Sequence, residues 1–285
     1  MKKFAIYTAI VGNYDTIRQP LAVDERFDYY LFSNDIREDH IGVWQVRPIP
    51  YSNPIQTKIA RWVKAHPEVL LPDYEYSLWL DANIQIRLPD VYKRSVALKE
   101  NETKAASMWH HQRDCIYDEA VAILCGQRDH ERPVFRWVQT LKEHRYPHHN
   151  GLFETGVLLR NHRDKTVQKM DSLWWDCISH YSRRDQLSFG FALWKNNLDC
   201  TLFLPNGQNT RNSPFFNYIL HENEKGGVIV NRKEDPFINY YHKVHPGDRH
   251  EHLAKIYQRL FRTPFPLFFL TLLGQYYRAI SVFHR

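Results

Sequence analysis

Residues 76–86 read YSLWLDANIQI, and this stretch decides the fold. Its first five residues form a short, apolar, aromatic-rich run after the turn signal Pro72-Asp73, which predicts a buried strand. Asp81 ends the run, and a carboxylate directly after a buried strand is unfavourable unless water, a partner or a metal reaches it. In an open α/β sheet the carboxyl ends of the strands form such a ligand-binding edge, so the stretch predicts a sheet of this class.

Asp81 and Asn83 are separated by one residue, so their side chains point the same way from an extended backbone. Together they offer two oxygen donors, the kind of ligand that a hard divalent cation prefers. The same D-x-N spacing is also typical of a turn in which Asp81 caps the strand and Asn83 is an ordinary turn residue. The residues alone leave both interpretations open.

The composition limits the class of protein. The chain has 285 residues, 43% of them hydrophobic, which is enough for one large domain or for a domain with an appendage. Its net charge of +6 favours an anionic partner: a nucleotide, a membrane surface or a nucleic acid. The four cysteines lack C-x-x-C spacing, which argues against zinc and redox motifs and predicts buried free thiols in a reducing compartment. The N-terminal residues predict a first strand rather than a signal peptide.

Apolar runs alternate with amphipathic segments, which indicates an α/β sheet flanked by helices. The predicted strands cover residues 3–10, 28–33, 44–49, 76–80, 104–109 and 200–204, with a further strand-like run around Gly151 and Gly156. The predicted helices cover residues 54–66, 88–99, 115–126, 133–144 and 164–179, and another begins near residue 183. Asp15, Asp35 and Asp81 follow three of the strands, so we expect a row of polar groups along one edge of a parallel sheet.

The turn after the first strand contains Gly12, Tyr14 and Asp15. Gly12 lets the backbone approach a ligand closely, while Tyr14 is suited to stack on a base and Asp15 to accept a hydrogen bond from a base or ribose. An ordinary exit from a strand explains the same residues. Lys58 and Arg61 share one face of the first predicted helix, where they either neutralise a diphosphate or form a solvated basic face.

Polar side chains also gather in the second half of the sheet region. His111 and Arg113 follow a predicted strand, and Glu154 lies in a run bracketed by glycines, where we expect an acceptor pocket. Asp185 near a helix start is either a helix-stabilising residue or an active-site carboxylate. Trp175 is either a core residue or a platform for a sugar.

The last third of the chain contributes two further features. Residues 239–252 contain four histidines, of which His242 and His245 are candidates to complete a metal site with the D-x-N pair; a mobile surface loop is the alternative. Residues 253–285 are amphipathic, strongly aromatic and flanked by arginines. We expect them to dock at an anionic membrane interface rather than to span the bilayer.

Five sequence blocks come in one order: YTAIVGNYD, KIARWVKAHPEVLLPDYEYSLWLDANIQI, HHQRDCIYDEA, GLFETGVLLRNH and WWDCISHYSRRDQLSF. In these blocks the chain resembles a glycosyltransferase-like family first catalogued as a domain of unknown function. That family has plant Golgi members involved in mucilage polysaccharide synthesis and many bacterial members. The resemblance covers about residues 4–205. It implies that residues 1–205 form a GT-A-like domain, a Rossmann-type mixed sheet flanked by helices, with residues 206–285 as a helical C-terminal appendage.

The resemblance also implies a nucleotide-sugar donor and a D-x-D-type metal motif, here Asp81-Ala82-Asn83, with asparagine in place of the second carboxylate. The expected cofactor is a divalent metal, Mn²⁺ foremost and Mg²⁺ as the alternative, with the candidate ligands Asp81, Asn83, His242 and His245. The candidate donor-binding residues are Thr8, Gly12, Tyr14, Asp15, Lys58, Arg61, Asp81 and Asn83. The candidate acceptor-binding residues are His111, Arg113 and Trp175. The candidate catalytic residues are Asp185 and Glu154, with Asp185 as the general base in an inverting reaction.

The implied activity is transfer of a sugar to a glycan or lipid-linked glycan, in cell-surface polysaccharide or lipopolysaccharide synthesis. The expected partners are the donor, the acceptor and an anionic membrane surface, and nucleic acid is not among them. We expect a cytoplasmic protein, peripheral at the inner face of the cell membrane. Two other classes stay open: a hydrolase of a lipid amide, as proposed for a plant relative, and a non-catalytic carbohydrate-binding protein. Manganese-dependent binding of a nucleotide sugar would distinguish transfer from both.

Overall fold

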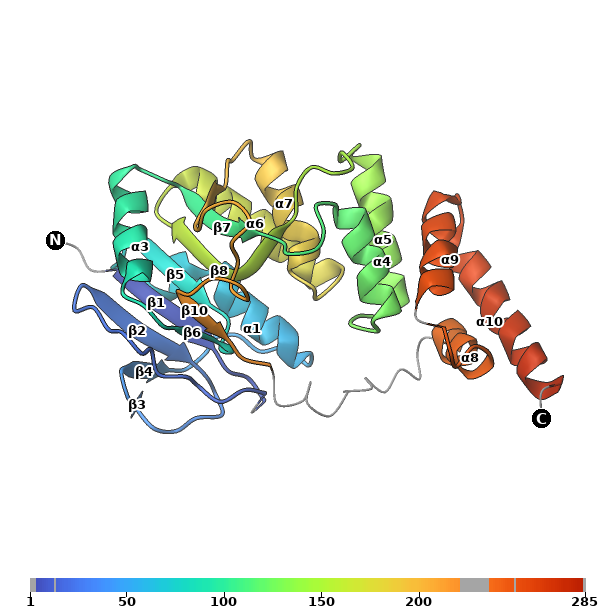
Figure 1. The fold of residues 1–285 in the computed structure, drawn as a ribbon, viewed down its shortest axis with the longest axis horizontal. Coiled ribbons are helices and arrows are strands. Elements are labelled where there is room, and N and C mark those ends of the chain that lie inside the picture. The colour runs from blue at the N-terminus through green and yellow to red at the C-terminus, as the bar shows by residue number, and fades with distance from the viewer. Residues whose placement is uncertain (1–3, 13, 221–235, 249, 284–285) are drawn as a thin grey trace.

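The centre of the molecule is one eight-stranded mixed sheet with the strand order β3-β4-β2-β1-β5-β8-β7-β9 (Figure 1). This computed structural model describes residues 4–12, 14–220, 236–248 and 250–283. The strands of the sheet are β1 Phe4–Ala9, β2 Phe27–Phe32, β3 His40–Ile41, β4 Trp44–Arg47, β5 Tyr76–Leu80, β7 Ala105–Trp109, β8 Phe153–Asn161 and β9 Thr201–Leu202. The sheet and its flanking helices confirm the predicted α/β class.

The direction of the strands places Asp81 at the expected edge. β4, β2, β1 and β5 run parallel, so their carboxyl ends lie along one side of the sheet. β8 runs antiparallel to both of its neighbours, β5 and β7. β5 coincides with the strand predicted at 76–80. Asp81 therefore lies just past the carboxyl end of a central strand, where a sheet of this kind binds ligands.

Helices cover both faces of the sheet. In this part of the chain they are α1 Gln56–Ala65, α2 Pro67–Leu70, α3 Asp90–Glu100, α4 Ile116–Cys125, α5 Glu131–Glu143, α6 Lys165–His180 and α7 Gln186–Lys195. One core cluster joins Tyr7 of β1 to Val63 of α1 and Met170 of α6. A second joins Ile6 to Tyr92 of α3. Because successive residues of a strand point to opposite faces, Ile6 and Tyr7 belong to different layers.

A two-stranded ribbon extends the sheet region past the expected boundary at residue 205. β6 Ile84–Ile86 pairs antiparallel with β10 Phe216–Tyr218. The amide of Ile219 also donates to the carbonyl of Asn83 at 3.0 Å. These contacts tie the chain after residue 205 to the segment that follows Asp81, so we place the end of the sheet domain after residue 220.

The C-terminal helices pack on α4 and α5, to one side of the sheet (Figure 1). They are α8 Pro236–Val244, α9 Glu251–Arg262 and α10 Pro266–Phe283. Tyr241, Tyr257 and Leu270 belong to the same core cluster as Phe135 of α5. A surface loop was one expectation for residues 239–252. This expectation is wrong for residues 239–244, which belong to α8. There α8 packs on α10, and Tyr241, directly before His242, is buried.

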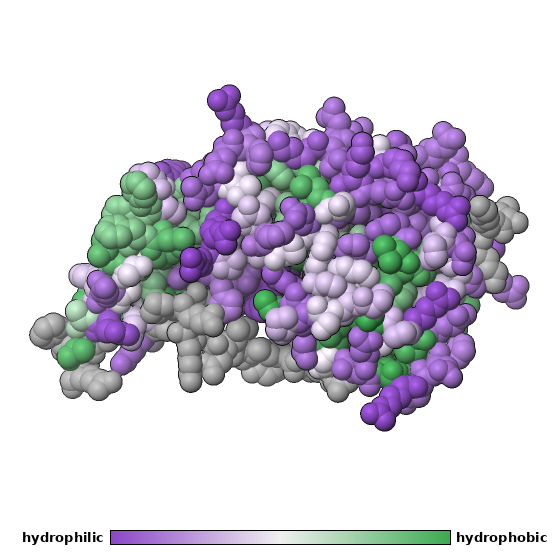
Figure 2. Space-filling model, turned by 180° about the vertical axis from the view of Figure 1, so that it is seen from behind, coloured by the Kyte–Doolittle hydropathy of each residue, from purple (hydrophilic) through white to green (hydrophobic). Residues whose placement is uncertain are grey.

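The amphipathic character predicted for the tail is confirmed in α10. Leu270 and Tyr277 are buried, whereas Phe268, Leu272 and Tyr276 are exposed on the opposite side. Figure 2 shows a hydrophobic patch over the C-terminal helices at the left of that view. Within the described ranges, no helix combines the length and the hydropathy needed to cross a bilayer.

Candidate active site

A buried cluster of four charges lies at the carboxyl end of β5. The ammonium of Lys64 donates to Asp185 Oδ2 at 2.6 Å and to Asp81 Oδ1 at 3.3 Å. Arg61 completes the cluster, with its Nε 3.2 Å from Asp185 Oδ1 and its Nη1 3.7 Å from Asp81 Oδ1. Two carboxylates and two cations balance one another, so the cluster as a whole carries no formal charge.

Four elements position these side chains. Arg61 and Lys64 lie three residues apart on α1 and so share one face of that helix. Trp79 of β5 donates its indole N–H to Asp81 Oδ1 at 2.7 Å. Thr155 of β8 donates its hydroxyl to Asp185 Oδ2 at 2.8 Å, just before α7. The site is therefore held by the central strands and the helix layer rather than by surface loops.

The cations set the ionisation of both carboxylates. Burial alone would raise the pKa of Asp185, but Arg61 and Lys64 outweigh it and hold that pKa well below its ordinary range. Burial also acts to raise the pKa of Asp81, but Lys64 and Arg61 lower it more, and Lys64 contributes more than Arg61. Burial in turn lowers the pKa of Lys64, against the pull of the two carboxylates. Both Asp81 and Asp185 are consequently anionic at neutral pH.

Asp185 does not act as a helix cap. It precedes α7 in helical backbone conformation, and its side chain accepts no capping hydrogen bond. Both of its oxygens instead face Arg61, Lys64 and Thr155. The active-site interpretation of this carboxylate is therefore the one that agrees with the geometry.

Asn83 lies apart from this charge cluster. Its amide Nδ2 donates to the carbonyl of Ile219 at 2.9 Å, which holds it in the β6–β10 ribbon. His242 and His245 are also not brought to Asp81, and the expectation of a shared metal site is corrected here. His242 lies on α8 and His245 directly follows that helix, which packs on α10 to one side of the sheet (Figure 1). Their rings pack among aromatic side chains of the C-terminal helices.

The described residues supply one suitable donor for a divalent cation at this edge. Oδ1 of Asp81 is engaged by Lys64, Arg61 and Trp79, and Oδ2 has none of these contacts. The side chain of Asp81 keeps 29% of its surface exposed. Mg²⁺-type sites are commonly built from one or two carboxylates together with substrate phosphates, and Asp81 fits that pattern.

The turn after β1 borders the same edge. The amide of Gly12 donates to Asp35 Oδ2 at 2.6 Å, which joins the ends of β1 and β2. Gly12 has φ +69°, and a Cβ there would lie 2.2 Å from the side chain of Gln56, so only glycine fits. Tyr14 is 48% exposed and interacts electrostatically with Arg61. Asp15 lies in the same turn and is partly buried.

Thr8, Lys58 and Trp175 have other surroundings. Thr8 is buried within β1, and its hydroxyl has no hydrogen-bond partner among the described residues. Lys58 donates to the carbonyl of Ser179 at 2.6 Å and thereby fixes α1 to the end of α6. Trp175 lies on α6, and its ring packs edge-on against the ring of Tyr51. Lys58 and Trp175 thus make packing contacts between the layers of α1 and α6, and their roles in donor and acceptor binding stay predictions.

A second polar cluster surrounds Glu154 of β8. Glu154 Oε1 lies 2.6 Å from Arg211 Nη1 and 3.0 Å from His111 Nδ1, and Thr210 donates to Oε2 at 3.3 Å. Burial lowers the pKa of His111, and Arg211 adds to this while Glu154 opposes it. His111 is therefore a neutral imidazole at neutral pH, with Nδ1 held by Glu154.

Arg113 lies beside this second cluster. Its Nε pairs with Glu119, which is buried in α4. His110 Nε2 is 3.8 Å from the same carboxylate, and burial together with Arg113 lowers the pKa of His110 to about 3. Of the residues expected on the acceptor side, His111 and Arg113 thus lie beside Glu154 and Glu119, and Trp175 does not.

β8 joins the two clusters. Glu154, Thr155 and Gly156 are consecutive, and the carbonyl of Gly156 accepts from the amide of Asp81 at 2.8 Å. A Cβ at Gly156 would lie 2.8 Å from Ile84 Cδ1 and 3.4 Å from Asp81 Oδ2, so the strand approaches the site closely. The edge therefore carries the charge-balanced Arg61–Lys64–Asp81–Asp185 half and an acid–imidazole half side by side.

Arg184 was not expected at the site from the sequence. Its Nε is buried and has no hydrogen-bond partner in the described part of the chain. Burial lowers its pKa, and its electrostatic neighbours include Arg61, Asp185 and Glu119, which belong to both halves of the site. An unpaired buried guanidinium donor is unfavourable and suits an anionic ligand.

Other residues missing from the sequence-based set are Lys64, Trp79, Thr155 and Arg211. The three-residue spacing of Arg61 and Lys64 was the one signal available. The contacts of Lys64 with Asp185 span 121 residues of sequence, so no local pattern reports them.

Comparison with known proteins now adds to this geometry. Residues 1–212 match the family model described as "TOD1/MUCI70, glycosyltransferase-like domain". The chain belongs to the TOD1/MUCI70 family. Asp81, Glu154 and Asp185 all lie within the matched TOD1/MUCI70 domain, and helices α8 to α10 follow it. The resemblance inferred from the five sequence blocks is confirmed.

Two further comparisons were made for this TOD1/MUCI70 chain. Comparison with curated proteins gives no match. Among solved structures, the chain is similar to the apo structure of the bifunctional glycosyltransferase WbbM, with 11% sequence identity and a TM-score of 0.40. That similarity covers 71% of this chain and 38% of the WbbM chain, so it spans well under half of the larger protein.

Proposed function

We propose that this TOD1/MUCI70 domain transfers a sugar from a nucleotide-sugar donor to a glycan or lipid-linked glycan acceptor. The observation that carries the proposal is the Arg61–Lys64–Asp81–Asp185 cluster at the carboxyl end of β5, beside the unpaired Nε of Arg184. Hydrogen-bond donors with positive charge in a partly buried site are what a diphosphate leaving group requires.

In this proposal the Arg61–Lys64–Asp81–Asp185 half, together with Arg184, binds the donor diphosphate. Arg61 and Arg184 carry guanidinium groups, which match phosphate oxygens with two donors in one plane. Their positive charge stabilises the negative charge that develops on the leaving nucleoside diphosphate. Asp185 and Asp81 hold Arg61 and Lys64 in place before the donor arrives, so little reorganisation is needed. The exposed ring of Tyr14, beside Arg61, is suited to the nucleoside.

The proposed metal is a divalent cation, Mn²⁺ foremost and Mg²⁺ second, held by Asp81 together with the donor diphosphate. When bound, it supplies Lewis-acid stabilisation of the leaving phosphate. Because Arg61 and Lys64 already balance the two carboxylates, Asp81 alone attracts a divalent cation weakly. Metal binding at Asp81 is therefore expected to require the nucleotide.

The acid–imidazole half is proposed to bind the acceptor. His111 is neutral, and Glu154 fixes its Nδ1, which leaves Nε2 free to accept a proton from an acceptor hydroxyl. Asp185 is less suited to this step, because both of its oxygens are occupied by Arg61, Lys64 and Thr155. In an inverting reaction we assign proton removal to His111, and we treat Asp185 as a positioning residue.

We further propose a lipid-linked acceptor and a peripheral location at the inner face of the cell membrane, in lipopolysaccharide or capsule-type synthesis. The exposed aromatic side chains of α10 and of the residue before it support this, because Phe265, Phe268 and Tyr276 are 69%, 61% and 59% exposed. Arg262 and Arg278 flank these side chains and are themselves exposed. Apolar side chains beside basic ones are typical of a helix that lies in an anionic membrane interface.

The deciding experiment titrates the full chain with a panel of nucleoside-diphosphate sugars, with and without Mn²⁺. We expect at least one donor to bind more tightly with Mn²⁺ and to be slowly hydrolysed without an acceptor. Asp81→Asn should remove the effect of Mn²⁺, whereas Asp176→Asn, whose side chain is 64% exposed on α6, should not.

Other outcomes separate the alternatives. Donor binding without turnover would indicate a carbohydrate-binding protein that has retained the fold. Failure of every donor to bind, together with release of fatty acid from a lipid amide, would overturn the transferase assignment in favour of the hydrolase.

A further inference from the structure

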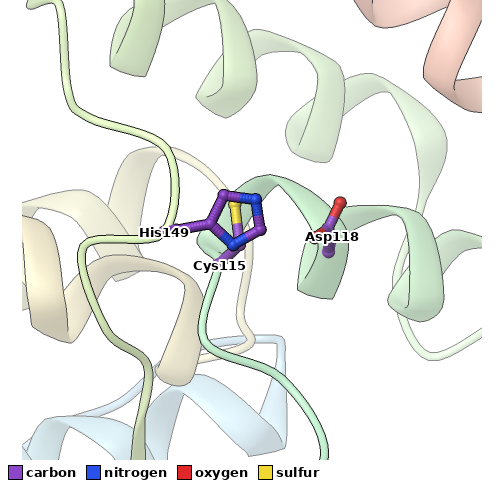
Figure 3. A group of neighbouring side chains, drawn as sticks. All are labelled: Cys115, Asp118 and His149. Carbon is purple, nitrogen blue, oxygen red and sulfur yellow. The ribbon is translucent and has the colours of Figure 1, made fainter.

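A second set of metal-ligating side chains lies outside the proposed donor site. Cys115, Asp118 and His149 each offer one ligand atom, and these three atoms lie within 4.8 Å of one another (Figure 3). Cys115 immediately precedes α4, and Asp118 is in the first turn of that helix. His149 belongs to the turn before β8, with φ +52°. Two segments that are distant in sequence thus bring a thiol, a carboxylate and an imidazole together.

The surroundings of His149 resemble those of a metal ligand. Its Nδ1 lies 2.8 Å from Asp114 Oδ1, which fixes the tautomer and leaves Nε2 as the nitrogen with a lone pair. A carboxylate on the far nitrogen is the usual support of a metal-binding histidine. His148 adds a further nitrogen, since its Nδ1 is 3.9 Å from the sulfur of Cys115. Its ring is held by stacking on Tyr117 at 4.0 Å.

The donor set selects the metal. Thiolate and imidazole ligands favour zinc, whereas Mg²⁺ and Mn²⁺ prefer oxygen. Cys115 is buried at the start of α4, and its sulfur lies among the other donor atoms of the cluster. Asp114 and Asp118 add negative charge, so the site is anionic before a cation binds, unlike the balanced cluster at Asp81.

We propose that Cys115, Asp118 and His149 bind a zinc ion, with His148 as the nearest residue for a fourth position. Ligand atoms bound to one tetrahedral zinc ion are about 3.5 Å apart, so the three side chains must close by roughly 1 Å. His149 is exposed and Asp118 is half-buried, so both are free to make that movement. Cys115 is buried and fixes the position of the site.

The proposed zinc ion would join two loops of the acceptor side. The segment before Cys115 carries His111 and Arg113, and the turn of His149 leads into Glu154. The two segments already meet where the amide of His110 donates to the carbonyl of Leu152 at 2.7 Å. Zinc would hold these two segments together on the acceptor side, without itself contacting the donor site. The proposal depends only on these residues and stands apart from the transferase assignment.

The test uses the full chain, freed of metal by a chelator, and Zn²⁺ or Co²⁺ without any nucleotide. We expect one equivalent of Zn²⁺ to bind, and Co²⁺ to give the thiolate-to-metal charge-transfer absorption that only a cysteine ligand produces. Cys115→Ser should abolish that absorption. Asp114→Asn, which keeps the three ligands, should weaken zinc affinity by about 10-fold to 100-fold.

Matched variants keep the test decisive. Cys177→Ser changes another buried thiol, on α6, and should leave the Co²⁺ spectrum unchanged. Asp81→Asn should also leave zinc binding intact, which separates this site from the donor site. If Cys115→Ser does not fold, His149→Ala at an exposed position reports instead. Absence of stoichiometric binding, or a cobalt spectrum that survives Cys115→Ser, would overturn the proposal.

Discussion

At the scale of single residues, the buried lysine of α1 organises the site. Lys64 has no exposed surface, and it reaches Asp81 and Asp185 at once. A buried ammonium is tolerated only where carboxylates compensate its lost hydration. The two aspartates therefore have a structural role toward Lys64 in addition to any role toward a ligand.

Replacement of Asp185 by asparagine tests that role. Asp185→Asn removes one partner from a buried ion pair, which typically costs about 3 to 5 kcal/mol of unfolding free energy. We expect donor Kd to rise, because Arg61 and Lys64 lose their support, and kcat to fall as a consequence. Donor titration and urea unfolding measure both effects. A fall of about 10²-fold to 10⁴-fold in kcat with unchanged Kd would instead make Asp185 the general base.

His162 makes stability depend on pH. Burial lowers the pKa of His162 to about 4, while its hydrogen bonds to Leu71 and Ser77 keep it in place. Below pH 6.5 the unfolded chain binds a proton at this residue, and the folded chain does not do so until about pH 4. Stability is therefore lost as pH falls through this window, by up to about 1.4 kcal/mol per pH unit.

The corresponding experiment compares urea unfolding at pH 7.5, 6 and 5 for the wild-type chain and His162→Asn. We expect the variant to be less stable at pH 7.5 but to lose less stability per pH unit. Equal slopes in the two proteins would show that another group, such as His110, causes the acid sensitivity.

At the scale of elements, an irregularity in β8 shapes the site. The register between β7 and β8 shifts between Ala106 and Met108, opposite the segment that starts at Glu154. Ser107 satisfies the carbonyls freed there, with hydrogen bonds to Glu154 and Val157. Such bulges re-aim side chains next to active sites. Here the bulge lets consecutive residues of one strand serve both halves of the site.

Gly156 makes this arrangement testable. A methyl group at this position would lie 2.8 Å from Ile84 Cδ1 and in van der Waals contact with Asp81 Oδ2, so Gly156→Ala should shift Ile84, cost about 1 to 3 kcal/mol and crowd Oδ2 of Asp81. We expect weaker donor binding in calorimetry as well as a lower Tm. Gly247→Ala is the matched control, because nothing lies within 4 Å of a Cβ there. Unchanged donor binding in Gly156→Ala would show that Asp81 tolerates the shift.

The sequence allowed prediction of elements better than of contacts between them. Apolar periodicity predicted strand β5, and it predicted helices α5, α6 and α7 with starts close to the observed ones. Asp81 was predicted as a site residue from its place directly after β5. The pairing of Lys64 with Asp185, and of Glu154 with Arg211, joins residues far apart in the chain. Local periodicity carries no information about such pairs, so basic side chains that line the site resemble ordinary solvated ones.

At the scale of the whole molecule, the C-terminal helices are an integral part of the fold. Leu270 and Tyr277 of α10 and Phe261 of α9 are buried with residues of α4 and α5. Removing the chain after residue 260 would therefore expose core surface, and the truncated protein would be a poor control for membrane binding. Substitutions on the exposed face of α10 avoid this difficulty.

The membrane proposal is tested by liposome flotation with anionic lipid. Phe265→Ser, Phe268→Ser and Leu272→Ser combined should abolish flotation of the full chain, because these side chains supply the exposed apolar area. Far-UV circular dichroism and Tm should change little. Gln275→Ser, on the same exposed side, serves as the control. Equal flotation of the triple variant and the wild-type chain would exclude α10 as the contact surface.

The long separation between Lys64 and Asp185 also governs when the chain can fold during synthesis. Asp185 leaves the ribosome 121 residues after Lys64, which at 5 to 20 residues per second is a delay of roughly 6 to 24 seconds. For most of that interval β5 lacks its neighbour β8, and throughout it the lysine lacks its closest counter-ion. We expect nascent chains that end before α7 to remain protease-sensitive and to bind chaperones. Protection should then appear abruptly once residue 185 has emerged.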